Sequence, residues 1–395
     1  MQQKRKPPMK KFRSFPNIFF SVGLALAALL LSYLSTNLNI ALSGEKTVLK
    51  YWCAFADWIT SGREHETEDD VVFVNVSYDR QLVDLTDEFG IPLGNAAVTD
   101  RGKLQQFLRM IDESGTYRYV MLDVFFEEGY ATESDSCLFS RIAGMDRIVI
   151  PRHIGGTLAD PRLDGKAAYA DYANSINEND FTKYRLFRKD GPSMPLKVHE
   201  DLTGRSVRRR LFWYADGWAL ARKVIFPKMY VRTSSPYRAD GEKAYLNLGA
   251  DILAYSAEID WAAYFKDKII VIGAFTDDDI HTTYAGDVPG CLINYNVFLS
   301  LTKGRHKIPL GLVVFYFLLF FSMAYMLLCA DSGIPQARTW FWGRLFVLYS
   351  LVLTIVCILV FAIWGQAQDI FITSTFFSTV NWVHHRIKSK TTRYA

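Results

Sequence analysis

Uncharged hydrophobic stretches alternate with strongly charged ones along this chain of 395 residues. No charged side chain occurs in Ile18 to Leu34, Ile308 to Ala330 or Leu345 to Gln368. About 20 such residues in a helix cross a hydrocarbon core of roughly 30 Å. A fourth stretch, Ile370 to Val383, is shorter and contains several Ser and Thr residues. The pattern predicts three membrane helices and leaves a fourth to be decided by the flanking charges.

Basic residues without acids flank both ends of this pattern. Six lysines and arginines precede the first stretch, and Arg386, Lys388, Lys390 and Arg393 follow the fourth. Basic flanks stay on the cytoplasmic side, so an even number of crossings is favoured. We therefore expect a multi-pass protein of the cell inner membrane with both termini cytoplasmic. The length of the first apolar stretch favours an uncleaved anchor over a cleaved signal peptide.

The predicted segments follow from these boundaries. They are a basic segment (1–16), a membrane anchor (17–36), a helix and linker (37–70), an extracytoplasmic domain (71–304), three further spans (308–330, 345–365, 369–384) and a basic tail (385–395). Residues 37–307 hold 33 basic and 39 acidic residues, a formal charge of −6. A mildly acidic external domain excludes the basic surface that nucleic-acid binding requires.

Short runs of β-branched residues predict a mostly parallel sheet in the external domain. Such runs lack the polar alternation of half-exposed strands, as expected for strands covered by helices on both faces. Four runs fit this description: Val71 to Val76, Tyr119 to Phe126, Arg147 to Ile150 and Lys268 to Ile272. Helices are expected between them, from Asp100 to Asp112, from Ser134 or Asp135 to Ile142, and from Pro289-Gly290 to Leu301. The predicted fold class is α/β, with Lys183 to Arg188, Met229 to Thr233 and Ala244 to Leu248 as further strands, the last two as antiparallel additions.

Acidic residues follow three of the predicted strands. Asp79 follows the first strand, Asp123 lies in the second run, and Asp277, Asp279 and His281 follow the last. In open parallel sheets, ligands bind beyond the carboxyl ends of the strands. These acids are therefore expected to bind a cation or a basic small molecule. Asp277, Asp279 and His281 are also the candidate metal ligands of a metal-assisted hydrolase. Each acid taken alone also fits a helix cap or turn.

The five cysteines do not form a metal or disulfide framework by their spacing. Three of them, Cys53, Cys137 and Cys291, fall outside the predicted spans. One disulfide among these three is an open alternative.

The end of the external domain resembles a known family. Lys266 to Gly273, then Asp279 and His281-Thr282-Thr283, then Val288-Pro289-Gly290 and Asn296 look like the closing signature of the CHASE domain, type 2. Val72 to Val76 with Asp79, Thr99-Asp100-Arg101, and Val120 to Phe126 with Asp123 resemble earlier parts of the same domain. The resemblance implies an extracellular sensory domain of bacterial signalling proteins, set between one preceding and three following membrane helices. It also implies that Asp79, Arg101, Asp123, Asp279 and Thr282 bind the ligand.

Three functions follow as hypotheses. The first is a membrane-bound sensory module that binds an unknown small-molecule or envelope ligand without a cofactor. Family members often continue into a cytoplasmic enzyme, whereas this sequence ends about a dozen residues after the fourth span, so a separate output partner or a homo-oligomer is expected to carry the signal. The second is a scaffold of a cell-envelope complex, and the third is the metal-assisted hydrolase. The first is favoured, which makes the protein a sensor and not an enzyme.

Overall fold

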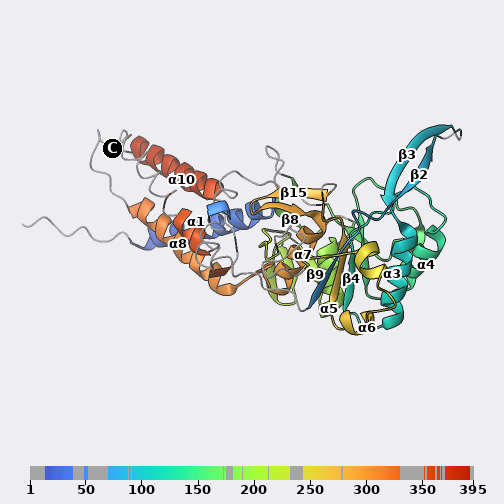
Figure 1. Ribbon diagram of the computed structural model, residues 1–395. Helices are drawn as coiled ribbons and strands as arrows, with labels where there is room; N and C mark the ends of the chain where they lie inside the picture. The colour runs from blue at the N-terminus through green and yellow to red at the C-terminus, as the bar shows by residue number, and fades with distance from the viewer. Residues whose placement is uncertain are drawn as a thin grey trace, which may run out of the picture. The chain divides into compact units, whose positions relative to one another are not determined.

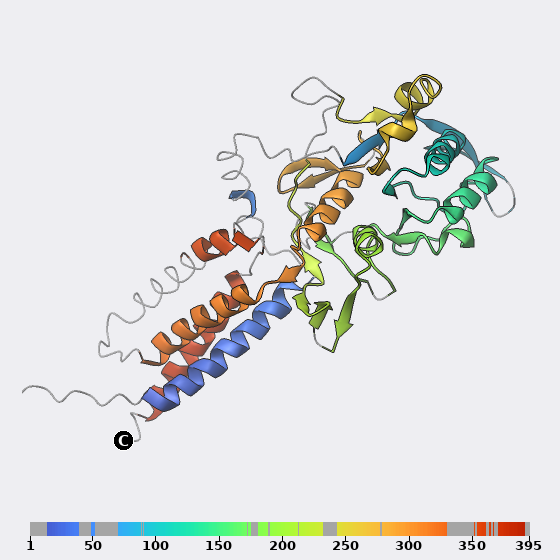
Figure 2. The ribbon, with the colours of Figure 1, turned by 90° about the horizontal axis from the view of Figure 1, so that it is seen from below.

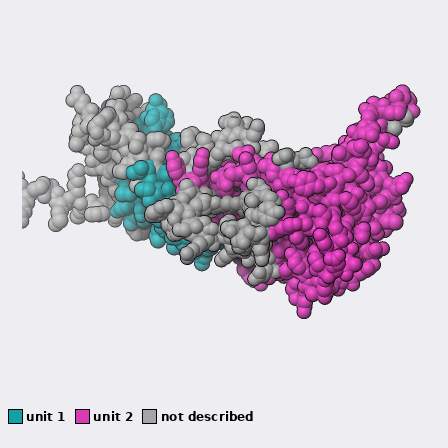
Figure 3. All heavy atoms as spheres, in the orientation of Figure 1, with its two compact units in different colours: residues 1–37, 308–395 teal, residues 38–307 magenta. Residues whose placement is uncertain are grey.

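The protein divides into two compact units, Met1–Asn37 with Ile308–Ala395, and Leu38–Lys307 (Figure 3). The computed structural model describes residues 14–38, 49–51, 70–87, 89, 91–171, 173–174, 181–188, 190–211, 213–231, 243–276, 279–329, 351, 354–360, 363–364, 366 and 370–391. The predicted helix and linker segment (37–70) therefore lies mostly outside the described residues, and Cys53 lies outside them as well.

The first unit contains the apolar helices. Helices α1 (Ser14–Thr36) and α8 (Leu310–Cys329) pack against each other through a shared core that includes Ala28 and Phe320. Within the described residues, two helices are long and apolar enough to cross a membrane, Asn17–Thr36 and Leu310–Leu328. Helix α10 (Ile370–Thr391) covers the predicted fourth span, but its polar residues leave it outside this set. Most of the predicted span 345–365 lies outside the described residues, so four crossings are not confirmed.

A six-stranded parallel sheet forms the centre of the second unit (Figures 1 and 2). Its strands, in spatial order, are β13 (Leu246–Asn247), β1 (Val71–Asn75), β14 (Ile269–Gly273), β4 (Tyr119–Leu122), β5 (Ile148–Arg152) and β6 (Ala167–Tyr169). Every residue of β1, β4 and β14 is buried, which is the reason their sequences show no polar alternation. The predicted α/β class with a parallel sheet is confirmed.

Helices cover both faces of this sheet. One face packs its valine, leucine and isoleucine side chains against α3 (Arg101–Ser114), α4 (Asp135–Gly144), the π-helical turn η2 (Leu248–Leu253) and α6 (Trp261–Tyr264). The other face meets α5 (Met194–Thr203) and α7 (Gly290–Thr302), where the Phe73 and Tyr295 rings lie 5.4 Å apart edge to face. Asp100 caps α3 by accepting from the Lys103 amide, as predicted.

Smaller sheets surround this core. Strands β2 (Arg80–Thr86) and β3 (Pro92–Thr99) form a hairpin that extends away from the rest of the unit (Figure 1). An antiparallel meander joins β9 (Val207–Arg210), β10 (Trp213–Asp216) and β11 (Ala219–Ala221). The other elements are β7 (Ala173–Asn174), β8 (Phe181–Arg185), β12 (Val224–Ile225), β15 (Ile280–Thr283), β16 (Gly286–Pro289), β17 (Lys307–Ile308) and the 3-10 turn η1 (Pro161–Leu163).

Three sequence predictions need correction. The strand expected over Met229 to Thr233 is not formed at residues 229–231, where Asn296 instead accepts hydrogen bonds from the Tyr230 and Val231 amides. The strand expected over Ala244 to Leu248 shortens to β13 and pairs parallel to β1, not antiparallel. Strand β4 ends at Leu122 and not at Phe126, since the chain leaves the sheet at Asp123. Cys137 and Cys291 are free thiols.

Candidate functional site

Three adjacent strands of the parallel sheet end at one pocket of about 700 Å³. Val76, Ala274 and Asp123, which directly follow β1, β14 and β4, line its floor. Strand β3 and the first residue of α7, Gly290, contribute to the walls. The position beyond the carboxyl ends of a parallel sheet is the usual ligand site of such folds, and the volume suits a small molecule.

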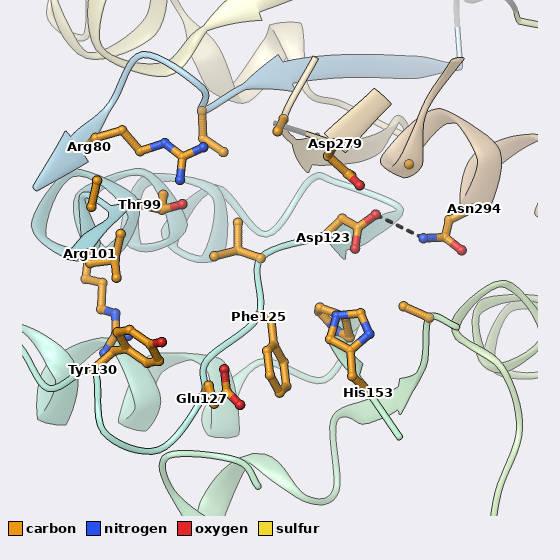
Figure 4. A pocket seen from close by; sticks show the side chains of 18 of the residues that line it. Arg80, Thr99, Arg101, Asp123, Phe125, Glu127, Tyr130, His153, Asp279 and Asn294 are labelled. Carbon is orange, nitrogen blue, oxygen red and sulfur yellow. Dashed lines mark hydrogen bonds between the residues drawn. The ribbon is translucent and has the colours of Figure 1, made fainter. Parts of the chain in front are cut away.

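Asp123 is the most strongly perturbed acid of the pocket. Its Oδ2 accepts a 2.9 Å hydrogen bond from Asn294 Nδ2 (Figure 4). Asn294 Oδ1 in turn accepts a 2.7 Å bond from the Tyr184 hydroxyl. Burial, then the negative charge of Asp279, raises the pKa of Asp123 to about 7, while Asn294 and His281 oppose this shift. Asp123 therefore changes between its neutral and ionised forms near physiological pH.

Asp279 lies beside Asp123 at the same end of the pocket, apart from Arg101 and Tyr130 (Figure 4). Its Oδ1 lies 2.8 Å from His281 Nε2, and both side chains are about one-third exposed. A Cβ at position 290 would overlap the Asp279 carboxylate, so only glycine allows this close approach to the start of α7. The amino end of a helix favours a negative charge, which suits an ionised Asp279 there.

Asp79 forms contacts that stabilise the fold. Its carboxylate is buried, accepts a 3.0 Å hydrogen bond from the Gly249 amide and pairs with Lys103 Nζ at 2.7 Å. The hydrogen bond to Asp79 is the largest cause of the raised pKa of Lys103. Asp79 thus ties η2 to α3 and is not among the described residues that line the pocket.

Arg101 lines the pocket, but its guanidinium contacts residues that do not line the pocket. Its Nη1 lies 2.6 Å from both carboxylate oxygens of Asp135, the first residue of α4. Its guanidinium also lies over the Phe126 and Phe139 rings at 5.6 and 5.8 Å. This side chain, only 2% exposed, fastens α3 to α4 and leaves little of its charge to a ligand.

Thr282 is the exposed residue of strand β15, and its hydroxyl donates a 2.9 Å hydrogen bond to Asp287. It does not appear among the described pocket residues. Of the candidate metal ligands, Asp279 and His281 form the pair described above, and Asp277 lies outside the described residues. The pocket therefore brings together Asp123, Asp279, His281 and the edge of Arg101.

Several pocket residues were missed by the sequence reasoning. Asn294 was not predicted because it lies within the hydrophobic sequence of α7. A side-chain amide in an otherwise apolar buried helix nevertheless indicates a specific hydrogen-bond partner, here Asp123. Phe125 and His153 form an edge-to-face pair with centroids 4.7 Å apart at the pocket wall. No local pattern marks these two, because only the spatial neighbourhood of β4 and β5 brings them together.

Comparison with protein families gives one match. The family model of the CHASE2 domain matches residues 22–328, well over half of the chain. Comparison with curated proteins and with solved structures finds no match.

Proposed function

Because the chain belongs to the CHASE2 domain family of extracellular sensory domains, we propose that it is a membrane-bound sensor whose pocket binds a small organic cation outside the cytoplasm. The observation that carries this proposal is the pair of acids, Asp123 and Asp279, at the carboxyl edge of the parallel sheet. The proposed role is binding and not turnover.

The charge distribution of the pocket favours a cationic ligand. Arg101 is neutralised by Asp135 and contributes little positive charge. The ionised Asp279, by contrast, disfavours a second negative charge on Asp123. A protonated amine or guanidinium that binds between these carboxyls favours ionised Asp123, so binding releases a proton near neutral pH.

Signal relay would follow the chain from the pocket to the membrane. Helix α7 begins at Gly290 in the pocket, and only residues 303–309 separate its end from the apolar helix α8. For a ligand to act through this connection, it must bind one arrangement of the domain more tightly than another. We propose that the signal passes from the membrane helices to a separate partner, with both termini in the cytoplasm as the basic flanks indicate.

A thermal unfolding experiment on the full chain tests the ligand class. A panel of small amines and guanidines is compared with carboxylic acids of similar size at pH 8. A cation present at about 100 times its Kd should stabilise the protein by about 2.7 kcal/mol. The Asp123→Asn and Asp279→Asn variants should lose this gain, while Thr282→Ala, outside the pocket, should keep it.

The opposite pattern contradicts the proposal, namely stabilisation by acids alone or gains that persist in both aspartate variants. Sidedness has its own test, because the Cys137 thiol is exposed. A membrane-impermeant maleimide should label Cys137 in intact cells whose outer membrane is permeabilised, and labelling only after lysis would reverse the assigned orientation.

A further inference from the structure

A second cluster of polar side chains is buried in the domain, formed by His199, Asp216 and His306. His199 is in α5, Asp216 is the last residue of β10, and His306 lies in the turn that follows α7. These segments are far apart in the sequence. None of the three residues lines the pocket described above.

The three side chains have the spacing of metal ligands. One nitrogen or oxygen atom from each lies within 4.8 Å of the other two, and the residues are 5%, 4% and 0% exposed, respectively. Ligand atoms around a tetrahedral Zn²⁺ are about 3.4 Å apart, given bonds of 2.0–2.1 Å. Closing the cluster around an ion therefore requires side-chain movements of about 1 Å.

Hydrogen bonding satisfies Asp216 but leaves one buried ring nitrogen of each histidine, Nδ1, without a hydrogen-bond partner among the described groups. Asp216 Oδ2 lies 2.9 Å from His306 Nε2 and 2.7 Å from Lys307 Nζ, so Asp216 is well paired. His199 Nδ1 is buried, and no described group forms a hydrogen bond with it. Its ring lies edge to face against the His306 ring, with centroids 5.4 Å apart. A buried imidazole nitrogen without a partner is costly unless another ligand satisfies it.

We propose that His199, Asp216 and His306 bind one transition-metal ion, with Zn²⁺ as the best match. Two nitrogen donors and one oxygen donor suit Zn²⁺ and its first-row neighbours, whereas Ca²⁺ and Mg²⁺ take oxygen ligands. His306 would bind the ion through Nε2 as the tautomer that carries its proton on Nδ1, and the ion would compete with the Lys307 ammonium for Asp216. Because Lys307 is 30% exposed, its side chain can turn towards solvent.

One of the three proposed ligands, His306, lies close in sequence to the apolar helix α8. His306 lies four residues before Leu310, the first residue of α8, and its carbonyl accepts a 2.9 Å hydrogen bond from the Arg222 amide. Metal binding would hold α5, β10 and this connecting segment together. This inference is independent of the ligand proposed for the acidic pocket.

The test is a metal titration of the full chain, purified in detergent without a histidine tag and stripped with a chelator. One equivalent of Co²⁺ should produce the intense visible absorption of a four-coordinate site, and Zn²⁺ should displace it. The His199→Gln variant should bind at least about 10-fold to 100-fold more weakly, the loss known for changes in residues that merely support ligands. His384→Gln changes a histidine of α10, which belongs to the other compact unit, and should bind as the wild type does.

Lys307→Met provides a variant in which binding should improve. Removal of the competing ammonium should raise the affinity severalfold, in line with the energy of a partly exposed ion pair. A structural role for the cluster predicts no such gain. If His199→Gln does not fold, the wild-type spectrum and the Lys307→Met comparison decide the matter. Absence of stoichiometric binding in the wild type, or equal binding by His199→Gln, overturns the proposal.

Discussion

Replacing Asp123 with asparagine should stabilise the protein at high pH. Asparagine retains an oxygen that can accept the 2.9 Å hydrogen bond from Asn294, and it removes the charge that the pocket disfavours. The change therefore isolates the electrostatic contribution from packing. Greater stability should coincide with loss of cation binding, as expected where a functional group is held in an unfavourable environment.

The magnitude follows from the pKa of Asp123. Its pKa is about 7 in the folded protein and 3.8 in the reference state, so the folded protein keeps a proton that the unfolded chain releases. The contribution of Asp123 to stability is therefore most favourable below about pH 4, falls as the pH rises to 7 and then stays level. The full difference corresponds to at most about 4 kcal/mol. We expect Asp123→Asn to gain about 2–4 kcal/mol at pH 8 and close to nothing at pH 4.

Chemical unfolding of both full-length proteins between pH 4.5 and 8.5 measures this difference. The expected result is a gap between variant and wild type that widens with pH and levels off above pH 7. Glu127→Gln provides the matched control, because Glu127 lines the same pocket but is exposed, and its gap should stay near zero. A gap for Asp123→Asn that does not vary with pH, or a variant less stable than the wild type at pH 8, would refute the reasoning.

The other predictions concern the same domain. Gly290→Ala should cost about 1–3 kcal/mol and abolish cation binding, because its methyl group would overlap the Asp279 carboxylate; Gly144→Ala, with open space around its Cα, should do neither in the same unfolding and binding assays. Arg101→Ala should cost about 3–5 kcal/mol by leaving the Asp135 carboxylate unpaired, and Arg101→Lys should recover part of this in denaturant melts. Calorimetry should show affinity for an organic cation falling up to tenfold per pH unit below pH 7, and a pH-independent affinity would be inconsistent with the raised pKa.

The central sheet was predictable because its strands are buried on both faces. β1, β14 and β5 lie within two residues of their predicted ends, and α3 begins after the predicted cap at Asp100. The peripheral strands were less predictable. The hairpin β2–β3 has largely exposed side chains, so its sequence does not alternate between apolar and polar residues in the way that burial imposes.

The only part of the site that could be predicted from the sequence is its position beyond the carboxyl ends of the parallel strands. Asp123 and Asp279 meet because β4 and β14 are neighbours, which the strand-end rule anticipates. Asp79 also follows a strand, but its carboxylate pairs with Lys103 and the Gly249 amide and does not line the pocket. The histidine cluster joins residues that are distant in the sequence, since Asp216 and His306 are 90 residues apart. No periodic pattern predicts such a contact.

The hairpin formed by β2 and β3 has a consequence for how a ligand reaches the pocket. Among the described residues these strands pair only with each other, yet β3 supplies Ala96 to Thr99 to the pocket wall. A two-stranded ribbon has little stability of its own, so its backbone amides should exchange with deuterium long before those of β1, β4 and β14. One wall of the pocket thus lies in the core, where exchange should be slow, and another lies in the hairpin, which should open most readily. Ligand entry past the hairpin therefore requires no global unfolding.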